Sequence, residues 1–236
     1  MKVKFRPVSK DAEISIAPPL PARKYLPQWY LDIPPFSGGK IAPTDSGRAN
    51  STVRICMPFS DSLSSGYIQE TWQDIYVEYL GESNGVDNLK IHQPDRIKMI
   101  GIRDGYSIPI QNEYYKNELV FHPPWIPELP KGWSMLYLSP LNRPDLPFQI
   151  ASGIVDSDLF SSAEKNSNMP FYIKKGFTGI IPKGTPMYQM IPIKRKKWTS
   201  EVLEFDYEHN LKINSSISQH MWGGYKKLYH NKKDYK

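Results

Sequence analysis

The sequence has little chemistry suited to a metal or redox site. Its 236 residues include a single cysteine, Cys56, which excludes a disulfide within the chain. Because Ile55 and Met57 flank this cysteine, we expect a buried structural thiol rather than a catalytic one. The five histidines show no spacing typical of metal ligands, so we expect no bound metal and no cofactor. They are His92, His122, His209, His220 and His230.

Other signatures are also missing. No stretch approaches the roughly 18 consecutive apolar residues of a membrane span, so we expect no membrane contact. Residues 1–5 lack the apolar region of a secretion signal. A phosphate-binding P-loop, a Gly-x-Gly-x-x-Gly turn and a serine nucleophile elbow are absent as well. These absences make an enzyme of a familiar class the weaker expectation.

Proline and aromatic residues are abundant instead. The chain contains 22 Pro, 15 Tyr and 6 Trp. Proline interrupts long helices, whereas aromatic side chains favour strands and contact surfaces. We therefore predict a mostly β fold, a sandwich or β-clip-like domain of about ten short strands. The predicted strands are 53–57, 66–68, 74–80, 88–92, 98–102, 119–122, 133–138, 152–155, 171–174, 178–181 and 187–193.

The spacing of prolines and apolar residues predicts three parts. Residues 1–50 form a Pro-rich lead with one short helix around 22–31, in which Trp29 and Tyr30 are aromatic anchors for a partner. Residues 51–198 form the β core. Residues 199–236 form a C-terminal segment with a helix over 216–229, weakened by Gly223 and Gly224, and a basic tail.

The positive charge is concentrated in two places. The net charge is +6, with +4 in the run Lys194, Arg195, Lys196 and Lys197 and +4 in residues 221–236. The run precedes Trp198, so it could meet phosphates while the ring stacks on a base. A solvated strand end with Trp198 packed on the body is the alternative. In the tail, Tyr225, Lys226 and Lys227 could contact nucleic acid, an acidic partner or a neighbouring subunit.

Four segments carry a family resemblance. They are Cys56–Phe59, residues 141–148 (Leu-Asn-Arg-Pro-Asp-Leu-Pro-Phe), Ser152–Asp158 and residues 182–192 (Pro-Lys-Gly-Thr-Pro-Met-Tyr-Gln-Met-Ile-Pro). The pattern resembles a family of uncharacterised proteins from tailed phages, including cyanophages. That resemblance implies a protein of the host cytoplasm or the virion.

A fainter resemblance concerns the order of Gly132, Gly153–Asp158, Gly184 and Gln189, which is similar to that of the dUTPase and dCTP-deaminase superfamily. The resemblance implies a β-clip fold, usually trimeric, with Asp156 and Gln189 at matching site positions. The superfamily's Arg-Ser phosphate motif would fall near Ser139–Arg143, which reads Ser-Pro-Leu-Asn-Arg. Its glycine-rich C-terminal arm is replaced by a lysine-rich tail.

Asp156 and Asp158 are two residues apart. On a strand they would share a face and could bind a metal or share a proton, whereas in a turn they would cap backbone N–H groups. We rank first a phage structural or assembly protein without catalytic activity, forming a homo-oligomer or binding other subunits. The alternative is a dUTPase-like nucleotide binder or hydrolase using Asp156, Gln189, Asn142 and Arg143. A third is an electrostatic nucleic-acid binder using the two basic runs.

Overall fold

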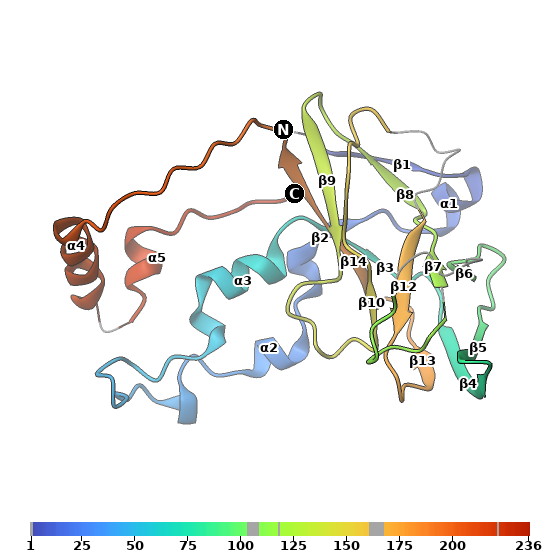
Figure 1. Ribbon diagram of the computed structural model, residues 1–236, viewed down its shortest axis with the longest axis horizontal. Helices are drawn as coiled ribbons and strands as arrows, with labels where there is room; N and C mark the ends of the chain where they lie inside the picture. The colour runs from blue at the N-terminus through green and yellow to red at the C-terminus, as the bar shows by residue number, and fades with distance from the viewer. Residues whose placement is uncertain (1, 103–108, 118, 161–167, 221) are drawn as a thin grey trace. The chain divides into compact units, whose positions relative to one another are not determined.

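The computed structural model describes residues 2–102, 109–117, 119–160, 168–220 and 222–236. These residues divide into two compact units. A β unit combines residues 1–21 with 66–195, and a helical unit combines residues 22–65 with 196–236. The mostly β fold expected from the sequence is confirmed (Figure 1).

A five-stranded antiparallel sheet organises the β unit, in the order β11-β9-β14-β3-β2. Strand β14 lies at its centre and pairs with β9 on one side and β3 on the other. The bounds are β2 (Leu20–Pro21), β3 (Tyr67–Glu70), β9 (Trp133–Leu138), β11 (Gly153–Val155) and β14 (Pro186–Lys194).

Three smaller antiparallel sheets complete this unit, in the orders β10-β12-β7-β6, β13-β4-β5 and β1-β8, beside helix α1 (Lys10–Ser15). Among the described strands, β5 and β6 each lie at the edge of their sheet. The bounds are β1 (Lys4–Pro7), β4 (Ile75–Ser83), β5 (Val86–His92), β6 (Ile100–Ile102), β7 (Leu119–Phe121), β8 (Trp125–Glu128), β10 (Phe148–Ile150), β12 (Met169–Ile173) and β13 (Gly179–Ile181).

Alternating burial places the core of the β unit. In β12, Met169, Phe171 and Ile173 are buried and the residues between them are only partly so. The ring centroids of Phe171 and Phe148 lie 5.2 Å apart. Because side chains of one strand point alternately to opposite faces, this pattern gives each small sheet one face toward a common core.

The helical unit contains short helices. Trp29 and the buried Tyr30 both pack against Phe59, and Arg54 lies over the Tyr30 ring. The bounds are η1 (Ala22–Tyr25), α2 (Gln28–Asp32), η2 (Ser37–Gly39), η3 (Val53–Ile55), α3 (Met57–Ser64), α4 (Tyr207–Ser218) and α5 (Gly224–Leu228). No helix among the described residues has the length and apolar character needed to cross a membrane.

Three local predictions were wrong. Residues 53–57 are not a strand, because the Thr52 side chain caps η3 and Pro58 fits the first turn of α3. Cys56 is therefore exposed at a helix junction rather than buried in a sheet. The single helix expected over 216–229 is two helices, since Gly223 has a left-handed φ of 72° that ends regular helix geometry. Strands β1, β2, β8 and β10 were not predicted.

Candidate interaction site

The two aspartates singled out in the sequence follow strand β11 and bind Arg195, at the end of β14. The Arg195 Nη1 atom lies 2.9 Å from Asp156 Oδ1 and 2.8 Å from Asp158 Oδ1. Asp158 also accepts a hydrogen bond from the backbone N–H of Gly132 at 2.7 Å, as expected of a capping aspartate. Ser134 donates to Asp156 at 2.6 Å. These contacts tie together the ends of β9, β11 and β14.

The other residues of the predicted nucleotide-binding site lie elsewhere. Gln189 is buried and its side-chain oxygen accepts the backbone N–H of Leu141 at 2.9 Å, which positions the loop holding Asn142 and Arg143. Arg143 binds both carboxylate oxygens of Asp145. Gln189 and Arg195 are six residues apart on an extended chain, about 20 Å along the backbone, so the loop contacts the middle of β14 and the aspartates contact its end. The predicted residues thus occupy two places.

The ion pair gives Asp158 a depressed pKa. The hydrogen bond from Arg195, followed by that from Gly132, lowers the pKa of the carboxyl from 3.8 to about 2, against the opposing effect of burial. The folded state therefore binds this proton less readily than the unfolded state does. The stabilisation is complete above about pH 3.8 and is lost as the pH falls toward 2.

We therefore expect Asp158→Asn to lower the urea midpoint of unfolding at pH 7, and the difference from wild type to shrink as the pH falls from 4 to 2. Asp11→Asn, which changes an exposed carboxylate on α1, is the matched control and should leave the midpoint at pH 7 nearly unchanged. An Asp158→Asn midpoint equal to that of wild type at pH 7 would refute the role given to this pair.

The basic run is less available than its sequence indicates. Lys194, Lys196 and Lys197 are exposed, but Arg195 is held by two carboxylates and carries little free charge toward a phosphate. Trp198 is 81% exposed, so the expectation that it packs on the body is wrong.

Trp198 belongs to an extended segment, residues 196–206, which we call the arm. It has no helix, strand or turn and leads into α4 (Figure 1). Its large apolar side chains are nearly all in solvent, with Val202 99% exposed and Leu203 and Phe205 each above three quarters. Soluble proteins rarely expose a continuous apolar stretch without a use for it, so the arm is a candidate contact segment.

The half of the arm nearer α4 is acidic, whereas its first two residues are Lys196 and Lys197. Glu201, Glu204 and Asp206 lie among the apolar residues and form no salt bridge with another described residue. Asp206 caps α4 by accepting the backbone N–H of His209 at 2.9 Å. In an extended conformation Glu201, Leu203 and Phe205 share one face, whereas Val202 and Glu204 share the other. The arm thus presents an apolar face with an acid at one end.

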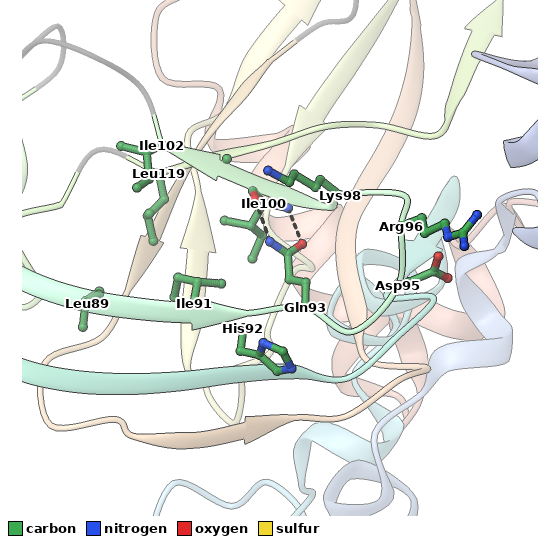
Figure 2. Close-up of a pocket in the computed structure, with 11 residues that line it drawn as sticks. Leu89, Ile91, His92, Gln93, Asp95, Arg96, Lys98, Ile100, Ile102 and Leu119 are labelled. Atoms are coloured by element: carbon green, nitrogen blue, oxygen red, sulfur yellow. Dashed lines mark hydrogen bonds between the residues drawn. The ribbon is translucent and has the colours of Figure 1, made fainter.

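A groove in the β unit lies between the edge strands β5 and β6 (Figure 2). It has a volume of about 570 Å³, and Leu89, Ile91, Ile100, Ile102 and Leu119 supply its apolar lining. Asp95 and Arg96 lie at one end, and Ile102 and Leu119 lie at the other (Figure 2). Lys98 adds a second cation to the rim. Neither Arg96 nor Lys98 forms a salt bridge with another described residue.

A larger hollow, of about 870 Å³, lies within the helical unit between residues 46–58 and 214–226. The predicted tail residues belong to this region: Tyr225 and Lys226 line the hollow, and Lys227 Nζ lies 5.8 Å from the centre of the Trp222 ring. The tail beyond is fastened to the same unit, because His230 and Lys233 both bind Asp61 and Arg23 binds Asp234. The described residues contain no group of three or more His, Cys, Asp or Glu arranged to hold a metal ion.

Comparison with known proteins adds one distant likeness. No protein-family model matches the sequence, and no curated protein matches it. Among solved structures, a mutant dUTPase from phage phi11 of S. aureus, with a structural Mg(II) ion, matches at 10% identity and a TM-score of 0.36. The match covers 88% of this chain and 99% of that one. It falls in the superfamily that the sequence faintly resembles, and it is too distant to support an inference about a site.

Sequence reasoning missed the arm and the groove. An alternation of acidic and apolar residues over 201–206 was a signal for the arm. The groove joins residues of β5 with residues of β6 and β7, and nothing local in the sequence marks it.

Proposed function

We propose that the protein is a structural or assembly protein of the phage type that acts without catalysis, by contacts with other protein subunits, including copies of itself. The observation that carries this proposal is the exposed apolar arm. Covering Trp198, Val202, Leu203 and Phe205 would contribute roughly 1.5–3 kcal/mol for each side chain. That sum, about 6–12 kcal/mol, offsets much of the cost of association, about 4–15 kcal/mol, so the arm would supply a large part of the free energy that holds subunits together.

The arm is better suited to this role than the termini. Tyr30 is buried within its own unit, and the C-terminal tail is held by Asp61 and Arg23. Residues 196–205 are exposed and form no salt bridge with another described residue, although they carry large side chains. The phage context comes from the sequence resemblance alone.

The two other candidate functions have less support. A dUTPase-like site would require Asp156 near Gln189 and free cationic groups for a triphosphate. Asp156 instead binds Arg195, and Arg143 binds Asp145. Nucleic-acid binding through the basic run would rest on its three exposed lysines, because the charge of Arg195 is offset by two aspartates.

The test is light scattering across a range of protein concentrations. We expect wild type to form oligomers, and a variant with Leu203→Ser and Phe205→Ser to associate at least about a hundredfold more weakly, since two buried side chains are lost. Ile14→Ser with Leu159→Ser is the matched control, because both residues are more than 70% exposed on the β unit, outside the arm.

A wild-type protein that stays strictly monomeric at high concentration, and that brings down no partner from infected cells, would contradict the proposal. Magnesium-dependent release of pyrophosphate from dUTP, abolished by Asp156→Ala, would instead support the nucleotide alternative.

A further inference from the structure

We propose that the groove between β5 and β6 receives the arm of a second copy of this chain. The inference rests on the proposed function, because it names the surface that covers the arm. It commits to one orientation: Glu201 at the Arg96 end of the groove, and Phe205 at the Ile102 end.

The main chain along the groove is suited to an added segment. Strands β5 and β6 each end a sheet, and an edge strand has backbone groups that can pair with an extended chain. At Ile100, the first residue of β6, the Gln93 side chain already makes the two backbone hydrogen bonds that an added strand would make. The Gln93 amide accepts the N–H of Ile100 at 2.8 Å and donates to its carbonyl oxygen at 2.7 Å (Figure 2). Beyond Gln93, the Ile102 side chain is 79% exposed.

The apolar surfaces of the groove and the arm match in spacing. The groove places Leu89 and Ile91 of β5 beside Ile102 and Leu119. In an extended arm, Leu203 and Phe205 lie on one face about 7 Å apart, which is the spacing of alternate residues along a strand. These two side chains can therefore cover the exposed floor of the groove while the backbone follows its edge.

The charges match as well. Glu201 lies on the same face as Leu203 and Phe205, one alternate residue before the apolar pair. Arg96 lies at one end of the groove beside Asp95, which already accepts the backbone N–H of Ile97 at 3.2 Å, and Lys98 lies over Ile100 in the middle (Figure 2). An arm running from Glu201 to Phe205 thus brings its acid to the Arg96 end and its apolar pair to the apolar end.

A cross-link tests the contact directly. In a Cys56→Ser background, copies with Ile102→Cys are mixed with mass-tagged copies carrying Phe205→Cys and oxidised in air. A disulfide requires Cα atoms within about 7 Å, so a covalent heterodimer on a non-reducing gel is expected only if these residues meet. Tagged copies with Ile14→Cys replace the Phe205→Cys copies as the matched control, since Ile14 is also exposed and lies outside the arm.

Charge reversal tests the orientation. We expect Glu201→Lys to raise the dissociation constant of the oligomer about tenfold. Combining it with Arg96→Glu and Lys98→Glu should return the dissociation constant most of the way to the wild-type value. Glu204→Lys is the matched control, because it makes the same charge change on the opposite face and should have a much smaller effect.

The outcomes separate the two proposals. If wild type associates through the arm but the Ile102→Cys and Phe205→Cys copies cross-link no more than the control, the groove is the wrong partner and the proposed function stands. If both cysteines in one chain join only within that chain, the arm folds on its own groove and the second copy is excluded. If wild type is strictly monomeric, the groove proposal fails, and the proposed function fails with it only if the protein also brings down no partner from infected cells.

Discussion

A Gly66→Ala variant is expected to lose at least about 3 kcal/mol of unfolding free energy, through strain and steric overlap together. Gly66 immediately precedes β3 and has a left-handed φ of 72°. A Cβ atom at this position would overlap the carbonyl oxygen of Met190 in β14, and backbone cannot move aside as a flexible side chain can. The substitution therefore pushes apart β3 and β14, the centre of the five-stranded sheet.

Gly85→Ala is the matched control for this prediction. Gly85 has a similar φ of 76°, in the turn between β4 and β5, but a Cβ there would meet nothing within 4 Å. Gly85→Ala should lower the free energy of unfolding by only the cost of placing alanine at a left-handed φ, about 1–2 kcal/mol. Urea unfolding of both variants measures the difference. Equal losses would show that the overlap with Met190 is relieved at no cost.

A Phe171→Ala variant is expected to lose about 3–5 kcal/mol, the usual cost of removing a large buried ring. Phe171 is fully buried in β12, where it packs against Phe148 and lies between β10 and β7. The neighbouring side chains come from strands fixed by hydrogen bonds, so they cannot close the cavity completely.

The control for this second prediction is Ile154→Ala, on strand β11 of the same unit. Ile154 is 64% exposed, and its truncation should cost under about 1 kcal/mol. Urea midpoints and slopes give the comparison. A Phe171→Ala loss no larger than that of Ile154→Ala would mean that the four-stranded sheet contributes little to the core.

The strands that the sequence predicted well have strong local signals. Residues 133–138 and 187–193 are rich in apolar and aromatic residues, interrupted only by Ser134 in the first and by Gln189 and Pro192 in the second, and they correspond to β9 and β14. The missed strand β8 contains Pro127, which normally argues against a strand, but it lies in a two-stranded pair with β1. Its stability comes from a partner more than a hundred residues away, which no local pattern reveals.

The candidate site was less predictable for the same reason. The sequence identified Asp156, Asp158 and Arg195 as charged groups, but only the pairing of β9 with β11 and β14 shows that they neutralise one another. Likewise, Lys98 and Arg96 look like ordinary surface cations until the sheet edges place them beside an apolar groove.

The position of β14 has a mechanical consequence. The arm follows this strand directly, and the strand pairs with β3 over residues 186–190 and with β9 over residues 189–194. A pull along the strand axis by a bound subunit loads these backbone bonds in shear, so several of them must yield together. An arm that emerged from an edge strand would instead peel away one bond at a time. The chain is therefore built to transmit tension from its contact segment into the middle of its largest sheet.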